Sequence, residues 1–100
     1  MSGVYRDDDE PPAGPVSLVQ RAQVARAFGP ILRTARNGAA LSQVELARRA
    51  GLIHTHVALM EGGILQPSLA TVINLAVALR IQPTMLVSLT VGRIRREVQP

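Results

Sequence analysis

The sequence predicts an all-α fold, a single compact bundle of five helices. Apolar residues make up 47% of the chain but only Tyr5 and Phe28 are aromatic, so the core must consist of aliphatic side chains and methionine. Apolar residues recur at helical spacing beyond about residue 17, and Ser, Pro or Gly stands where helices begin and end. A length of 100 residues allows one domain at most.

Residues 43–62 are central to this prediction, because they indicate two short helices joined at a glycine. Ser42 can cap the first helix, and a glutamate follows three residues later, as in a capping box. Gly51 suits the left-handed residue that ends a helix, since it lacks a Cβ atom. Ala47 leaves room for a crossing helix, whose apolar stripe includes Val57. This pattern is typical of a helix-turn-helix.

One helix is predicted before this pair. Ser17 offers an N-cap, and apolar residues follow at helical spacing, namely Leu18, Ala22, Ala25 and Phe28. Gly29-Pro30 predicts either a kink or a break into two pieces, because proline removes a backbone hydrogen bond. Asn37-Gly38 is expected to end this helix.

Two further helices are predicted after the pair, beyond a loop at residues 62–67. Ser68 can cap the fourth helix, which has a wide apolar face made of Leu69, Val72, Ile73, Leu75, Ala76 and Leu79. Pro83 suits the first turn of a fifth helix, with Leu86 and Leu89 facing inward.

The chain divides into three parts. Residues 1–16 combine acidic residues, proline and glycine and are expected to form a disordered tail. Residues 17–90 form the folded domain. Residues 91–100 form a C-terminal tail that suits dimerisation, and their spacing fits either a helix extension or a strand.

Charge is distributed unevenly along the chain. Residues 1–20 carry a net charge of −3, whereas residues 21–100 hold ten arginines and three glutamates, a net charge of +7. A basic domain fits a polyanionic partner, although basic domains are also simply soluble. The acidic tail could shield that domain, but a merely solvated tail is the simpler interpretation. No apolar run reaches the length of a membrane span and no signal-peptide pattern is present, so a soluble cytoplasmic protein is expected.

Several groups of residues occur in an order and spacing that match a known protein family. They are Phe28-Gly29 with Leu32-Arg33 and Arg36, Leu41-Ser42-Gln43 with Leu46-Ala47 and Ala50-Gly51, Val57 with Glu61 and Gly63, Pro67-Ser68-Leu69, and Leu75-Ala76 with Ala78-Leu79. Together they resemble the phage repressor/Cro family, also called XRE-type helix-turn-helix proteins, over residues 28–89. The resemblance implies a lambda-repressor-like five-helix domain that binds double-stranded operator DNA as a two-fold homodimer, with its third helix in the major groove.

The resemblance assigns roles at the start of the second helix and around it. Ser42 and Gln43 match positions that hold DNA phosphate, which suits a helix N-terminus with free N–H groups. Arg33 is expected to contact phosphate or to be plain surface. Arg36 and Glu61 match a structural salt bridge that orients the third helix without contacting a base.

The resemblance places base reading at Ile53, His54, Thr55 and Leu59, where this sequence departs from the family pattern. None of these side chains has the forked donor or acceptor that reads a base with two hydrogen bonds. His54 and Thr55 can make single hydrogen bonds, whereas Leu59 and Ile53 can only touch a thymine methyl. Ile53 also replaces a polar cap, at a cost of about 1 kcal/mol unless Thr55 caps the helix instead.

Two alternative functions fit these features of the sequence. In the first, the protein is a sequence-specific DNA-binding transcriptional regulator, repressor-like, that depends on phosphate contacts, thymine methyls and DNA shape. In the alternative, the fold acts mainly as a protein-interaction module, such as an antitoxin or anti-activator, with weak or no DNA binding. Its partner would then bind an exposed apolar patch, which consists of Ile53, Leu59, Ile64 and Leu65.

A homodimer is expected, because one short recognition helix covers too few base pairs for useful specificity. The candidate interface is the fifth helix or the C-terminal tail, through Met85, Val87, Leu89, Val91 and Ile94. Val77 on the fourth helix could join either a homodimer or another protein.

An enzyme is not expected, and neither is a cofactor. His54 and His56 are two residues apart, whereas a helical zinc pair needs a spacing of four. Without cysteine, thiolate metal sites and disulfides are excluded.

Overall fold

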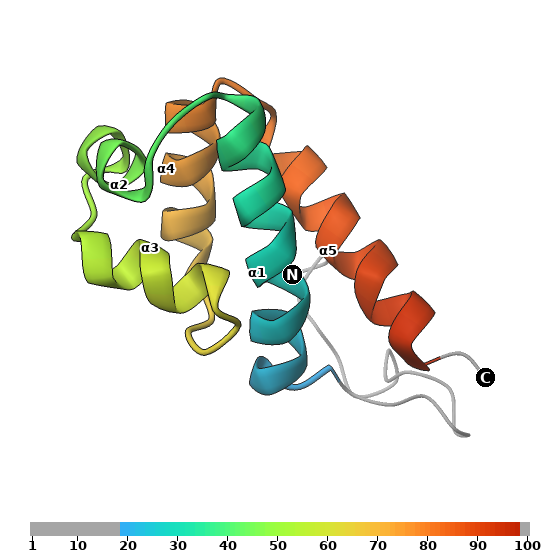
Figure 1. The fold of residues 1–100 in the computed structure, drawn as a ribbon. Coiled ribbons are helices and arrows are strands. Elements are labelled where there is room, and N and C mark those ends of the chain that lie inside the picture. The colour runs from blue at the N-terminus through green and yellow to red at the C-terminus, as the bar shows by residue number, and fades with distance from the viewer. Residues whose placement is uncertain (1–18, 99–100) are drawn as a thin grey trace, which may run out of the picture.

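The structure is a computed structural model that describes residues 19–98, so the predicted tail at residues 1–16 lies outside the described residues. These residues form helices without a strand (Figure 1). The helices are α1 (Arg21–Gly38), α2 (Gln43–Ala50), α3 (His54–Glu61), α4 (Leu69–Leu79) and α5 (Pro83–Val98). The predicted all-α class and the order of the five helices are confirmed.

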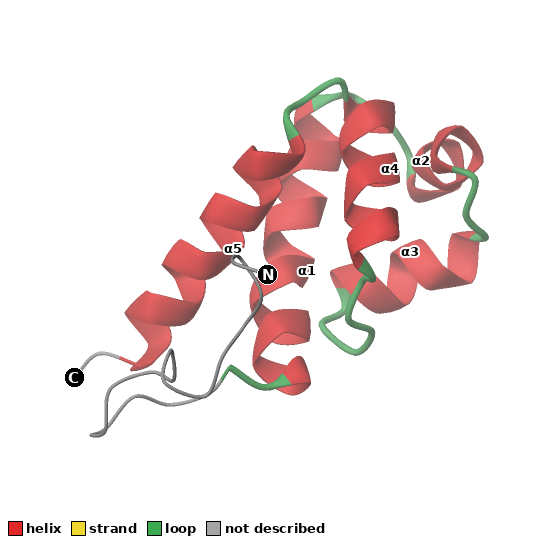
Figure 2. Ribbon diagram, turned by 180° about the vertical axis from the view of Figure 1, so that it is seen from behind, coloured by secondary structure: helices red, strands yellow, loops and turns green. Residues whose placement is uncertain are grey.

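The two helices of the predicted pair lie apart from the last helix. α2 and α3 lie at one side of the molecule, α5 lies at the other, and α1 and α4 lie between them (Figure 1, Figure 2). α1 packs against both α3 and α5, and α4 packs against both α2 and α5. This arrangement leaves the outer faces of α3 and α5 free for separate contacts.

The core is aliphatic apart from one phenylalanine, as the composition predicts. All five helices contribute to it, through Phe28, Leu32, Leu46, Ala47, Ala50, Val57, Met60, Val72, Leu75, Ala76, Leu79 and Leu86. Each fully buried leucine contributes roughly 1.5–3 kcal/mol to the free energy of unfolding. The core therefore fixes the positions of α2 and α3, although each has only eight residues.

α1 begins later than predicted. Its first residue is Arg21 and its N-cap is Gln20, whose backbone N–H donates to Oε1 of Gln23 at 2.8 Å. Residues 19–20 precede the helix, so the expected start directly after Ser17 is wrong, although Ser17 itself lies outside the described residues. Ala22, which the predicted apolar face includes, is exposed, whereas Ala25 of the same face is buried.

Gly29-Pro30 does not divide α1. The helix continues through Pro30 to Gly38, so the expectation of a break is wrong. Only the hydrogen bond that the missing N–H of Pro30 would donate is lost, and the packing of both halves on the core outweighs that loss. The helix ends at Gly38, as Asn37-Gly38 predicts, and the left-handed residue that follows it is Ala40, with φ of 59°.

The apolar face of α4 is narrower than predicted. Leu69 is 72% exposed and Ile73 is also exposed, while the other members of the predicted face are buried. The two exposed residues line a shallow hollow between α4 and the start of α5.

α5 is longer than predicted, and it continues to Val98. The expected domain boundary at residue 90 is therefore wrong, and residues 91–98 extend the helix. Its inward face is made of Leu86, Thr90 and Ile94 at a spacing of four, and Thr90 Oγ1 donates to the Leu86 carbonyl at 2.7 Å. Leu89 consequently points outward and is 50% exposed, which contradicts the expected inward orientation.

No single helix of residues 19–98 is long and apolar enough to span a membrane. α4 and α5 reach that length and apolar content only as a pair, across a bend of 116°, and both bury core residues inside the bundle.

Candidate nucleic-acid interface

α2 begins at a capped end, as predicted. Ser42 Oγ accepts a hydrogen bond from the backbone N–H of Glu45 at 3.0 Å. The Glu45 carboxylate does not complete the capping box, because it pairs with Arg48 at 2.5 Å and Arg49 at 3.4 Å. The hydrogen bond from Arg48 lowers the pKa of Glu45. The N–H groups of the first turn that Ser42 does not satisfy remain available to an anion.

Gly51 sets the angle between α2 and α3. It has φ of 70° and ψ of 30°, the left-handed conformation predicted for it. The N–H of Leu52 donates to the Ala47 carbonyl at 2.8 Å, and that of Gly51 donates to the Arg48 carbonyl at 3.4 Å. These two bonds form a Schellman motif, which stops α2 and redirects the chain into α3.

α3 presents one face to the core and the other to solvent. Val57, Met60 and Glu61 are buried. The residues of the N-terminal end are exposed on the other face, namely Ile53 (60%), His54, Thr55 and His56, and Leu59 is half-buried. The positions at which the sequence analysis places base reading therefore border solvent at the start of α3 and along its outer face.

The start of α3 has no side-chain cap. Ile53 occupies the N-cap position with φ of −88° and ψ of 151°, and α3 begins at His54. The expected alternative, in which Thr55 caps the helix one turn later, is wrong. The loss of a polar cap costs α3 about 1 kcal/mol.

Glu61 anchors α3 to α1 from inside the molecule. Its side chain is fully buried and accepts two hydrogen bonds from Arg36, at 2.5 Å to Oε2 and 3.0 Å to Oε1. Arg36 also donates to the Leu41 carbonyl at 2.9 Å, so it fixes the loop before α2 as well. Arg33 Nε lies 3.5 Å from Glu61 Oε1, and its side chain is 56% exposed.

Several effects act on the charge of Glu61. Burial, the largest of them, raises the pKa of Glu61. Hydrogen bonds from Arg36 and Gln43 and the charge of Arg36 together outweigh burial, so the pKa lies below its ordinary value. The hydrogen bond to Glu61 in turn raises the pKa of Arg36. Both groups are therefore charged at neutral pH.

Gln43 connects this buried pair to the exposed end of α3. Its Nε2 donates to Glu61 Oε1 at 2.9 Å, and its Oε1 lies 3.1 Å from Nε2 of His54. These contacts could not be predicted from the sequence, because they join α2 to both ends of α3 and leave no local pattern. The structure thus brings Gln43 and His54 into one network with the Arg36–Glu61 pair.

Comparison with known proteins identifies this arrangement. Residues 27–89 match the model of a protein family described as a helix-turn-helix domain. The chain belongs to the helix-turn-helix domain family. Among solved structures, it is similar to the crystal structure of the restriction-modification controller protein C.AhdI from Aeromonas hydrophila, with 39% sequence identity and a TM-score of 0.60. The similarity covers 62% of this chain and 94% of that chain. No curated protein matches the chain.

These matches confirm the resemblance to the repressor/Cro-like helix-turn-helix proteins. The matched residues run from α1 to α5 and include the whole α2–α3 unit. The chain is therefore a DNA-binding transcription regulator of the helix-turn-helix type.

One residue that positions the helix-turn-helix was missed by the sequence analysis. Gly29 of α1 packs against the end of α3, where a Cβ atom would lie 2.7 Å from the Met60 carbonyl oxygen and 2.6 Å from that of Glu61. Only glycine permits this approach, which brings Arg36 and Glu61 within reach. The available signal was the glycine next to Pro30, but a Gly-Pro pair also predicts a helix interruption, so the sequence alone does not reveal the close contact.

The exposed apolar patch, which would support a protein-interaction role, is smaller than the four-residue patch predicted from the sequence. Leu65 packs against the core and Leu59 is half-buried. Only Ile53 and Ile64 (74%) are well exposed, and they flank opposite ends of α3. Eight helical residues separate those ends by about 12 Å.

Proposed function

We propose that the protein is a sequence-specific transcriptional repressor that binds operator DNA as a homodimer, with α3 in the major groove. The observation that carries this proposal is the outward face of α3, whose exposed polar residues lie opposite its buried face. The net charge of +7 over residues 21–100 supports a phosphate-rich partner.

Backbone contacts are proposed for Ser42, Gln43 and Arg33. The Gln43 amide nitrogen carries two hydrogens, and only one of them is donated to Glu61. The second hydrogen can therefore bind a phosphate oxygen beside the N-terminus of α2. The half-exposed Arg33 side chain can reach outward because its single contact with Glu61 is long, at 3.5 Å.

Base contacts are proposed for Ile53, His54, Thr55 and Leu59. Each polar member offers single hydrogen bonds, and each apolar member offers contact with a thymine methyl. Such contacts discriminate less than an Arg–guanine or Gln–adenine pair, so DNA shape supplies part of the specificity.

The homodimer is proposed to form through α5. Its outer face carries the small residues Thr84, Ser88 and Gly92 at a spacing of four, which permits a close crossing with a second copy. Exposed apolar residues flank this stripe on both sides, namely Met85 and Leu89 on one side and Val87 and Val91 on the other. Ile94, which the sequence analysis included in the interface, is only 8% exposed because it packs inside its own chain.

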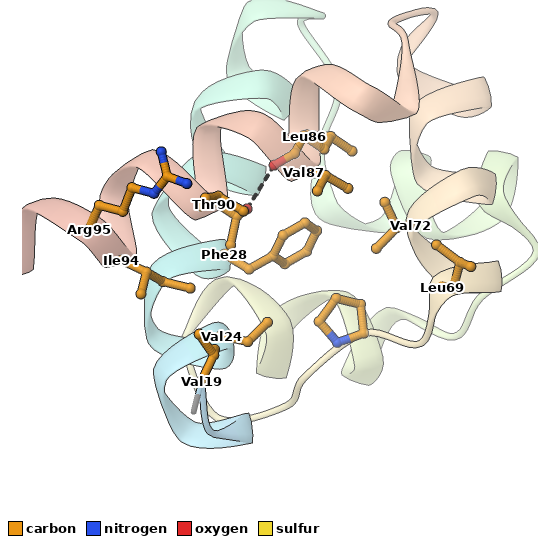
Figure 3. Close-up of a pocket in the computed structure, with 12 residues that line it drawn as sticks. Val19, Val24, Phe28, Leu69, Val72, Leu86, Val87, Thr90, Ile94 and Arg95 are labelled. Atoms are coloured by element: carbon orange, nitrogen blue, oxygen red, sulfur yellow. Dashed lines mark hydrogen bonds between the residues drawn. The ribbon is translucent and has the colours of Figure 1, made fainter. Parts of the chain in front are cut away.

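An apolar groove extends this surface between α1, α4 and α5 (Figure 3). The buried Phe28 lies at its base, and Val87 and Val91 of α5 are among the residues that line it. Exposed apolar surface of this extent is typical of protein interaction sites. α5 lies on the side of the molecule opposite α3 (Figure 1), so a dimer through α5 leaves both recognition helices free for DNA.

Selection of bound DNA from a random pool tests this proposal. The selected sequence should be a two-fold repeat with half-sites about 34 Å apart. Its affinity should fall with salt, with a log–log slope of about −0.9 for each phosphate neutralised. Binding of no DNA at any salt concentration would contradict DNA recognition by α3.

The repressor role has its own test. A promoter that carries the selected site should lose transcription when the protein is present, because the bound dimer occupies DNA that the polymerase needs. Increased transcription from that promoter would contradict repression while leaving DNA binding intact.

A further inference from the structure

A chain of polar contacts leads from the core to the His54 ring. The carboxylate of Glu61 accepts from Nε2 of Gln43 at 2.9 Å, and Oε1 of Gln43 faces Nε2 of His54 at 3.1 Å. The chain therefore passes from a fully buried side chain of α3, through the first residue of α2, to the first residue of α3.

The charge of Glu61 determines how the Gln43 amide is oriented, and the Gln43 amide in turn determines which nitrogen of His54 carries the proton. An ionised carboxylate only accepts hydrogen bonds, so the amide nitrogen of Gln43 must face Glu61. The amide oxygen then faces His54, and oxygen also only accepts. Nε2 of His54 must therefore carry the proton.

Nδ1, the other ring nitrogen of His54, is available to a partner outside the chain. Among residues 19–98, the structure gives Nδ1 of His54 no hydrogen-bond partner, and His54 is exposed. In a neutral ring whose Nε2 is protonated, Nδ1 is an acceptor and cannot donate.

We infer that Glu61 and Gln43 fix His54 as a hydrogen-bond acceptor, so that it selects a base with an amino group in the major groove. Adenine offers N6 and cytosine offers N4 there, whereas guanine and thymine oxygens and ring nitrogens are acceptors. The inference rests on the proposed function, and it assigns His54 the role of specificity residue and Gln43 that of positioning residue.

The first test measures the proton directly, without DNA. Long-range proton–nitrogen NMR spectra of the histidine rings are recorded at about pH 8, where histidine is ordinarily neutral. His56 is an internal reference, since it is exposed and the described residues give it no side-chain hydrogen bond. His54 should show protonated Nε2 alone, whereas His56 should show a mixture of tautomers.

The variant Q43L removes both amide contacts at a half-exposed position without changing side-chain size greatly. In this variant the His54 spectrum should move toward that of His56. Identical tautomer ratios for His54 and His56 in the unmodified protein, or protonated Nδ1 at His54, would overturn the inference.

The second test measures base preference by selection from a random DNA pool. The unmodified protein should enrich adenine or cytosine roughly tenfold at one position of each half-site. H54A and Q43L should both lose that preference and keep the preferences at other positions, although Q43L also binds more weakly overall. A purely structural role for Gln43 would lower affinity without changing base preference, and that result would overturn the positioning role.

The outcomes also separate this inference from the proposed function. Enrichment of guanine or thymine at the position that H54A alters would overturn the inference and leave sequence-specific binding intact. Failure to bind any DNA would instead overturn the proposed function, and with it the base assignment.

Discussion

At the scale of single residues, the Arg36–Glu61 pair has the largest structural consequence. Glu61 is fully buried in α3, and its oxygens accept hydrogen bonds from α1 and α2. Removing one partner of a buried pair leaves an uncompensated charge and typically costs about 3–5 kcal/mol. The pair thus holds α3 in a fixed orientation, as a helix that recognises DNA requires.

Acid should weaken the fold through Glu61. Its pKa is lower in the folded chain than in the unfolded chain, so the unfolded state binds more protons as the pH falls. The stability that Glu61 contributes is complete above the ordinary glutamate range and is lost as the pH falls through the lowered pKa. In urea titrations, the difference in unfolding free energy between the unmodified protein and E61Q should therefore shrink below about pH 4.

The control for that experiment is E45Q. Glu45 pairs with arginines at the surface, where water screens the charges, so its removal should change stability little at any pH. A difference between the unmodified protein and E61Q that stays constant from neutral to acidic pH would contradict the assignment to Glu61.

The N-cap of α3 is a second residue-scale weakness. Replacing Ile53 by serine supplies the missing acceptor at a position whose backbone is already extended, and Ile53 is mostly exposed. I53S should therefore raise the free energy of unfolding by about 1 kcal/mol. S42A, which removes an existing cap from α2, should lower it by a similar amount, as measured by chemical denaturation. Unchanged stability in I53S would show that the first turn of α3 is capped in another way.

At the scale of elements, the crossing of α1 and α3 depends on Gly29. Alanine is normally the better helix residue by about 0.5–1 kcal/mol, but here its Cβ atom would meet two backbone carbonyls. Overpacking of this kind typically costs about 1–3 kcal/mol, so the collision exceeds the gain in helix propensity. G29A should lower the midpoint of thermal unfolding.

Gly38 is the matched control, because a Cβ atom there would have no neighbour within 4 Å. G38A should leave stability unchanged or raise it by up to about 1 kcal/mol. Equal stability of G29A and G38A would contradict the close approach of α1 and α3.

Local features were predictable from the sequence, and contacts between elements were not. The caps at Ser42 and Gly51 depend on a few neighbouring residues, so their spacing was sufficient. The role of Gly29 depends on the position of α3, and the Gln43–His54 contact depends on how two helices cross. Motif resemblance placed α2 and α3 correctly in the chain, but it could not show which hydrogen bonds orient their side chains.

At the scale of the whole molecule, the proposed DNA surface and the proposed dimer surface lie on different sides. α3 is held at one side, while α5 exposes apolar residues at the other (Figure 1). Mutations in one surface should therefore leave the other surface intact.

Replacing Leu89 by glutamate should convert the dimer into a monomer, as measured by light scattering. Leu89 is half-exposed, so a charge there should disturb the interface and not the core. V77E on α4 is the control, since Val77 is 69% exposed and lies outside the proposed interface. A dimer that survives L89E but dissociates in V77E would move the interface to α4.

The central claim is that the outer face of α3 meets DNA. The most direct measurement is a titration of the protein with its selected duplex, followed by assigned proton–nitrogen NMR spectra of the backbone. We predict that the largest changes fall at residues 42–44 and 53–59. Changes confined to α5, with residues 53–59 unaffected, would contradict the claim.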